Sequence, residues 1–130
     1  MPHILVEYTD NLGAEADIKG LLKKLAAKMV DSRGVFPVGG VRVKALRITE
    51  YVIADGEDDY AFVNTTAMIG PRRDPQFKKT FFSEMFEIIE AHFAAIFERR
   101  YLALSLYVQE VDEDGSFRKN NIHSKFKTKA

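Results

Sequence analysis

The sequence predicts an α+β fold, a tandem β-α-β repeat in which a four-stranded sheet carries two helices on one face. Each half of the chain, about 1–56 and 57–130, contains a helical pattern flanked by two strand-like segments. A helix that crosses between two strands implies that those strands run parallel. We expect the two halves to form a single domain over 1–130. Because two helices cover only one face of such a sheet, self-association is expected to cover the other.

The first half begins with a strand at the start of the chain. Residues His3–Tyr8 alternate with the period of two that is typical of a strand. The next apolar positions recur at the spacing of one helix face: Ile18, Leu21, Leu22, Leu25 and Met29. A second strand starts near Val41, and its apolar phase slips at Ala45-Leu46. This slip predicts a β-bulge.

The second half repeats this plan. Tyr60–Ile69 is a nearly continuous apolar run, which is typical of a strand buried on both faces. Asp74 is expected to cap a long helix that has Pro75 at its first position and ends near Arg99. The last strand is expected over Leu102–Val108, and a polar, basic tail follows it.

Composition limits the classes of function that this chain can have. Its 130 residues include 19 Lys and Arg, 19 Asp and Glu and no Cys. A formal net charge of zero provides no general field for nucleic acid or an acidic membrane. Without cysteine there is no disulfide and no thiolate chemistry. No apolar run approaches the ~20 residues that span a bilayer, and the start of the chain does not resemble a signal peptide. We therefore expect a cytoplasmic protein without nucleic-acid or membrane partners.

The residues give no sign of a metal or a nucleotide cofactor. His3, His92 and His123 lie far apart, with no carboxylate at ligand spacing. His92 falls in an apolar helical stretch and is interpreted as a buried or subunit-contact residue. No helix follows Gly39-Gly40, so this pair does not form a phosphate-binding loop. We expect no metal site and no cofactor.

The candidate for chemistry is Pro2. The initiator methionine is normally removed before proline, which would leave Pro2 with a free secondary amine. An amine acts as a general base only if it is neutral near the working pH, whereas a chain-terminal amine ordinarily titrates near ~8. Burial beside cationic side chains would lower that pKa. A retained Met1 would instead make the Pro2 nitrogen an amide with no basic lone pair.

Further residues carry a resemblance to a known family. Pro2 opening a strand, the β-α-β repeat and Val41-Arg42-Val43 at the start of a second strand together resemble the tautomerase superfamily. Within it, the chain is similar to the 5-carboxymethyl-2-hydroxymuconate isomerase family. The stretches that carry this similarity run in order over nearly the whole chain: Met1-Pro2-His3, Val6-Glu7, Asp10-Asn11, Glu15-Ala16-Asp17, Phe36-Pro37, Ala54-Asp55-Gly56, Asp59-Tyr60-Ala61-Phe62-Val63, Ile69-Gly70, His92-Phe93-Ala94-Ala95, Leu102-Ala103-Leu104-Ser105 and Asn120-Asn121-Ile122-His123.

The resemblance implies a trimer whose catalytic proline, Pro2, lies at the edge of a pocket shared between subunits. It also implies a cofactor-free isomerase of homoprotocatechuate degradation, a route of aromatic catabolism. Such an enzyme moves a proton from a dienol hydroxyl to a distant carbon and so produces a ketone. The tail from Arg118 onward is then expected to pack against a neighbouring subunit.

The resemblance also implies which side chains bind substrate. Arg42 matches the superfamily arginine at the start of the second strand, and guanidinium groups suit a substrate that carries several carboxylates. Arg73, just before the cap Asp74, matches a second arginine, although Arg72 stands where the superfamily has glycine. Phe117 is expected to help wall the pocket. From the residues alone, Arg42 and Arg73 could equally be ordinary surface cations.

Two other functions stay open from the sequence. One is a tautomerase that acts on a different keto-enol acid. The other is a non-catalytic oligomeric binding module that keeps the same scaffold.

Overall fold

The computed structural model describes residues 2–126, so Met1 and its removal, like the last four residues of the basic tail, lie outside the described residues. Four strands and three α-helices follow one another along the chain: β1 (His3–Thr9), α1 (Ile18–Val30), β2 (Arg42–Ile48), β3 (Tyr60–Ile69), α2 (Pro75–His92), α3 (Ala94–Arg99) and β4 (Tyr101–Glu110). Among these residues, no helix is long and apolar enough to cross a membrane.

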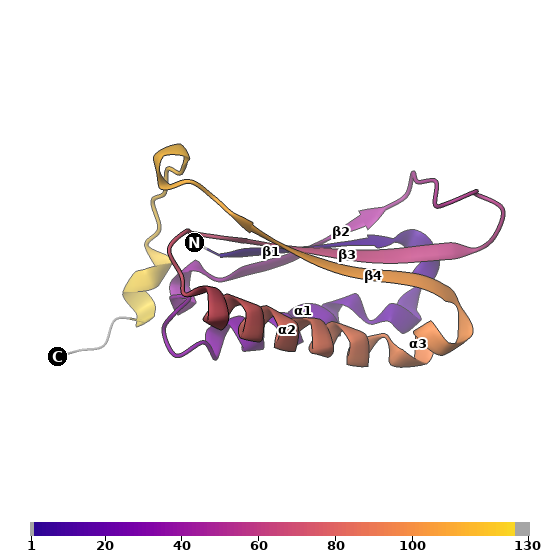
Figure 1. Cartoon of the computed structure of the whole chain (residues 1–130), viewed down its shortest axis with the longest axis horizontal. Coiled ribbons are helices and arrows are strands. Elements are labelled where there is room, and N and C mark those ends of the chain that lie inside the picture. Colours follow the sequence, from indigo (N-terminus) through magenta and orange to yellow (C-terminus); the bar gives the residue numbers. More distant parts are fainter. Residues whose placement is uncertain (1, 127–130) are drawn as a thin grey trace.

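The strands form one sheet in the order β2-β1-β3-β4. The pairs β1–β2 and β3–β4 are parallel, and the central pair β1–β3 is antiparallel. All three α-helices lie on the same side of the sheet (Figure 1). The predicted α+β fold, with a parallel strand pair in each half and helices on one face, is confirmed.

The core lies between the sheet and the helices. Ile4 and Val6 of β1 are fully buried there against Leu25 of α1 and Ile89 of α2 in one continuous hydrophobic cluster. Along β3, fully buried residues alternate with partly buried ones. The expectation that both faces of β3 are buried is therefore wrong for the single chain, because no element within residues 2–126 covers the second face.

The predicted bulge in β2 is also wrong. The register between β1 and β2 runs without interruption from His3 opposite Arg42 to Thr9 opposite Ile48. Leu46 stands opposite Glu7 and is 51% exposed. The apparent slip of the apolar phase is therefore caused by a single leucine on the face of the sheet that the helices do not cover. Tyr107 of β4 is also exposed on this face.

The helix boundaries follow their capping residues. Asp74 accepts a hydrogen bond from the backbone N–H of Phe77 at 2.9 Å, which confirms it as the N-cap of α2. The single long helix expected to run to about Arg99 is interrupted at Phe93, which separates α2 from α3. Phe93, the residue between the two helices, is fully buried in the core.

After β4 the chain returns to the end of the molecule where it began. Residues 112–126, here called the C-terminal arm, lie beside the start of β1 (Figure 1). The side-chain amide of Asn120 donates to the carbonyl of Gly39 at 2.8 Å. The described part of this tail thus contacts its own chain, and its expected packing against a neighbouring subunit stays a prediction.

Candidate active site

Pro2 is fixed at the sheet edge from which β1 starts. It is buried, and its carbonyl accepts a hydrogen bond from the backbone N–H of Arg42 at 3.2 Å. His3, the next residue, already pairs with strands on both sides, Arg42 on β2 and Met68 on β3. Pro2 is therefore anchored directly before a strand that is paired on both sides.

Pro2 lines a cavity of about 480 Å³, here called the Pro2 pocket. Three segments far apart in the sequence form its walls: the turn before β2, the loop between β3 and α2, and the C-terminal arm. Its other lining residues are Val35, Pro37, Gly40, Gly70, Pro71, Arg72, Arg73, Glu113, Arg118 and His123.

Arg73 is the innermost cation of the Pro2 pocket. Its guanidinium donates to the carbonyl of Gly70 at 2.8 Å and to that of Val35 at 3.3 Å. It also stacks 4.7 Å from the centre of the Phe36 ring. Burial lowers the pKa of Arg73 from its ordinary value, yet a guanidinium stays protonated in proteins. Its buried Nε has no hydrogen-bond partner within residues 2–126.

Arg72 is placed differently from its neighbour. It is exposed, adopts a left-handed backbone with φ +70°, and forms an ion pair with Glu113 of the C-terminal arm at 2.8 Å. Both arginines line the cavity, but only Arg73 is fixed against the protein interior. Of the two, Arg73 therefore has the more fixed position, and its match to the expected second arginine stays a prediction.

Arg42 is not part of the Pro2 pocket of its own chain. Its guanidinium donates to the carbonyl of Gly40 at 3.1 Å. Its strand position is opposite His3, whose pKa is lowered by burial and then by the charges of Lys44 and Arg42. A single chain therefore does not bring Arg42 and Arg73 together around Pro2.

Phe117 does not wall the Pro2 pocket either. It is 92% exposed and lines a smaller cavity of about 150 Å³ next to it, with His3 and Met68 among its neighbours. The two cavities share Gly70 and Arg118. Phe117 thus lines the cavity next to the Pro2 pocket and not the pocket itself.

Sequence reasoning missed Arg118, His123 and Glu113, which all reach the pocket from the C-terminal arm. A sequence signal did exist in the pair Gly39-Gly40, because adjacent small residues permit a close approach of another segment. Nothing in the sequence identifies that segment.

His92 has a structural role. Its Nδ1 lies 2.9 Å from Nζ of Lys24, and its Nε2 lies 2.7 Å from the carbonyl oxygen of Ala16. With the proton on Nε2, the ring donates to the carbonyl and accepts from the lysine. This half-buried histidine therefore ties α2 to the start of α1.

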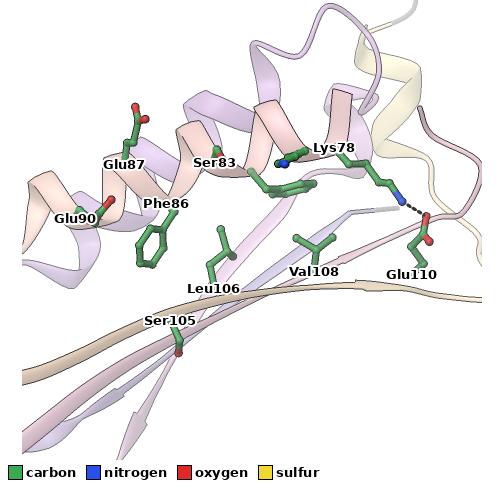
Figure 2. A pocket seen from close by; sticks show the side chains of 11 residues that line it. Lys78, Ser83, Phe86, Glu87, Glu90, Ser105, Leu106, Val108 and Glu110 are labelled. Carbon is green, nitrogen blue, oxygen red and sulfur yellow. Dashed lines mark hydrogen bonds and ion pairs between the residues drawn. The ribbon is translucent and has the colours of Figure 1, made fainter. Parts of the chain in front are cut away.

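A larger hollow than the Pro2 pocket lies elsewhere. A groove of about 830 Å³ runs between α2 and the edge strand β4, with Phe86, Leu106 and Val108 on its walls (Figure 2). Across its end, Lys78 pairs with Glu110 at 3.1 Å. Apolar walls beside an unpaired strand edge are typical of a packing surface.

Charge distinguishes the Pro2 pocket from this groove. Three arginines and one glutamate line it, a formal balance of +2 with His123 neutral, inside a chain whose net charge is zero. Guanidinium groups bind carboxylates with two parallel hydrogen bonds. The pocket is therefore suited to a small ligand that carries more than one carboxylate and reaches Pro2.

Comparison with known proteins agrees with this geometry. A family model described as 5-carboxymethyl-2-hydroxymuconate isomerase matches residues 2–126. The chain belongs to the 5-carboxymethyl-2-hydroxymuconate isomerase family. It is 39% identical to 5-carboxymethyl-2-hydroxymuconate Delta-isomerase of Escherichia coli over 127 residues, which cover 98% of this chain and 100% of that protein.

Solved structures place this isomerase family within a wider fold. A 5-carboxymethyl-2-hydroxymuconate isomerase from Deinococcus radiodurans R1 superposes with a TM-score of 0.94 at 40% identity, covering 98% of this chain and 95% of that one. A structure described as a fused 4-OT wild type symmetric trimer shares the fold, with a TM-score of 0.67 at 11% identity over 90% of this chain and 93% of that one. This fold is the one expected for the tautomerase superfamily.

Proposed function

We propose that this chain is a cofactor-free isomerase that converts the enol of 5-carboxymethyl-2-hydroxymuconate, or a closely related polycarboxylate, into its ketone. The observation that carries the proposal is Pro2, buried in a pocket with a positive charge balance at the start of a central strand. The named relative acts as a Delta-isomerase, which agrees with proton transfer along a conjugated chain.

Pro2 acts as the general base once Met1 has been removed. Its neutral amine takes the proton of the enol hydroxyl, and the electron pair of that O–H bond forms the carbonyl. The double bonds shift along the conjugated chain, and a distant carbon takes the proton back from the Pro2 ammonium. Atoms and charge balance over the cycle. Burial and the nearby cation of Arg73 favour the neutral amine.

Arg73 binds a substrate carboxylate and stabilises the negative charge that develops during transfer. Its position is fixed before substrate arrives by two backbone carbonyls and the Phe36 ring. A cation that needs no reorganisation during the reaction contributes most to catalysis.

The active unit that we propose is a homotrimer in which Arg42 of a neighbouring subunit completes the pocket. Two features support it: the sheet face opposite the helices carries exposed Leu46, Met68 and Tyr107, and a protein of the same fold is described as a symmetric trimer. In this trimer Phe117, which is exposed in the single chain, would lie beside the pocket shared between subunits.

A ketonisation assay tests the proposed reaction. Protein with a free Pro2, verified by mass, should convert 5-carboxymethyl-2-hydroxymuconate with a loss of enol absorbance. Pro2→Ala keeps a small second residue, so Met1 should still be removed, and we expect a loss of about 10²- to 10⁴-fold in kcat, typical of a missing general base. Unchanged activity in Pro2→Ala would refute the mechanism. Binding without conversion by the native chain would favour the non-catalytic binding module.

Mixed assemblies test the shared site. Pro2→Ala and Arg42→Ala should each be nearly inactive, but refolding the two together should restore part of the activity. Some pockets then combine an intact Pro2 with an intact Arg42 of the other variant. A monomer in a sizing experiment, or no recovery in the mixture, would contradict the trimer with a shared pocket.

A further inference from the structure

The C-terminal arm contributes to the candidate site although it is far from Pro2 in the sequence. It starts after β4 and returns to the end of the molecule where β1 begins (Figure 1). Arg118 and His123 of this arm line the same cavity as Pro2 and Arg73. The arm is therefore part of the pocket and more than a trailing terminus.

The arm is fixed on both sides of Arg118. Before it, Glu113 pairs with Arg72 at 2.8 Å. After it, Asn120 donates to the Gly39 carbonyl at 2.8 Å and accepts from the backbone N–H of Ile122 at 2.7 Å. These contacts connect the arm to two other walls of the pocket, the loop after β3 and the turn before β2.

Gly39 allows the arm to lie this close. A Cβ atom placed on Gly39 would lie 2.7 Å from both Cα and Nδ1 of His123, closer than nonbonded atoms approach. Part of the obstruction is backbone, which a rotamer change cannot relieve. Any larger residue at position 39 must displace the arm, and Arg118 with it.

The cations of the pocket are not equivalent. Arg72 is neutralised by Glu113, and Arg73 is bound to carbonyls of the pocket wall. Arg118 forms no ion pair with any residue of 2–126. It lies where the Pro2 pocket meets the smaller cavity, since it lines both. A ligand that fills the first cavity and branches toward the second would reach it.

We propose that Arg118 makes the Pro2 pocket selective for a substrate with an additional, branched carboxylate. This inference rests on the proposed function. The name of the related enzyme's compound implies two carboxylates at the ends of a muconate and a third on its carboxymethyl branch. Arg73 binds one end of the chain beside Pro2, and Arg118 binds the carboxymethyl group where the two cavities join. The arm is thus a specificity element that Gly39 and Asn120 hold in place.

The test compares two substrates, 5-carboxymethyl-2-hydroxymuconate and 2-hydroxymuconate, which lacks the carboxymethyl group. Arg118→Ala should reduce the preference for the branched substrate, expressed as a ratio of kcat/KM values, by about 10- to 100-fold, the range for a lost charge-assisted contact. The change should appear mainly in KM. Arg118→Lys should recover part of the preference, because it keeps the charge without the planar fork.

Two further variants separate this role from general damage to the arm. Lys119→Ala removes the adjacent charge, which lines neither cavity, and should keep the native preference. Gly39→Val should reduce the preference in the same direction as Arg118→Ala. An unchanged ratio in Arg118→Ala, or an equal loss on both substrates, would overturn the proposal.

Failure of the proposed function gives a different result. If native protein with a free Pro2 converts neither substrate, calorimetric binding of tricarballylate and of glutarate still tests the selectivity. Tighter binding of the tricarboxylate that disappears in Arg118→Ala would support the role of Arg118. Equal binding of the two acids by the native chain would overturn it.

Discussion

Replacement of Arg73 by alanine removes a cation whose position the protein fixes from three sides. The native guanidinium bonds the carbonyls of Gly70 and Val35 and lies over the ring of Phe36. A hydrogen bond that involves a charged group contributes about 1.5–3 kcal/mol. Loss of one such contact to a substrate carboxylate should lower kcat/KM roughly 10- to 150-fold.

Stability should also fall in Arg73→Ala, because two carbonyls at the pocket wall lose their donor. We expect about 1–3 kcal/mol from urea unfolding. Arg73→Lys keeps the positive charge, but an ammonium cannot bridge both carbonyls and stack in the same plane. Its kcat/KM should therefore lie between those of the native chain and Arg73→Ala.

The matched control is Arg99→Ala on α3, at the other end of the molecule from Pro2 (Figure 1). Arg99 pairs with Glu15 at the surface, and both side chains are about half exposed. Such pairs contribute about 0–1 kcal/mol, so activity should stay native. If Arg73→Ala retains the kcat/KM of Arg99→Ala, the assignment of Arg73 to substrate binding is refuted.

Two further predictions concern the folded chain. Asp74→Ala removes the side chain that accepts from the Phe77 N–H and should lower the free energy of unfolding by about 0.5–2 kcal/mol. Asp74→Ser should restore most of that loss. Equal urea midpoints for Asp74→Ala and Asp74→Ser would contradict the role of Asp74 as a cap. Burial, with the charges of Lys44 and Arg42, lowers the pKa of His3 below its unfolded value. The stability that the neutral form of His3 contributes is therefore complete above about pH 6.5 and is lost as the pH falls through the folded pKa. Urea midpoints measured across this range should therefore depend less on pH in His3→Gln than in the native chain, and identical slopes would exclude His3 as the cause.

Most of the fold could be predicted because its signals are local. The periods of two and of about 3.6 residues identify the strands and helices, and the cap Asp74 with Pro75 fixes where α2 starts. The errors have local causes too. Leu46 gave a false bulge because an apolar residue on an uncovered face looks the same in sequence as a change of register.

The candidate site was only partly accessible to sequence reasoning. Pro2 and Arg73, both predicted from the sequence, line one cavity because each lies directly beside a strand start or a helix cap, so their places follow from local geometry. Arg42 was expected beside them, but its strand position and its bond to the Gly40 carbonyl leave it outside the pocket of its own chain.

The sequence by itself determined the α+β repeat, the strand that begins at His3 and the proline before it. Only the tertiary structure decided that Arg118 and His123 belong with Pro2, since their placement depends on the contact between His123 and Gly39, residues far apart in the chain. The physical reason is the range of the interactions. Backbone periodicity and capping act over a few residues, whereas the walls of a pocket are set by long-range packing that no local pattern records.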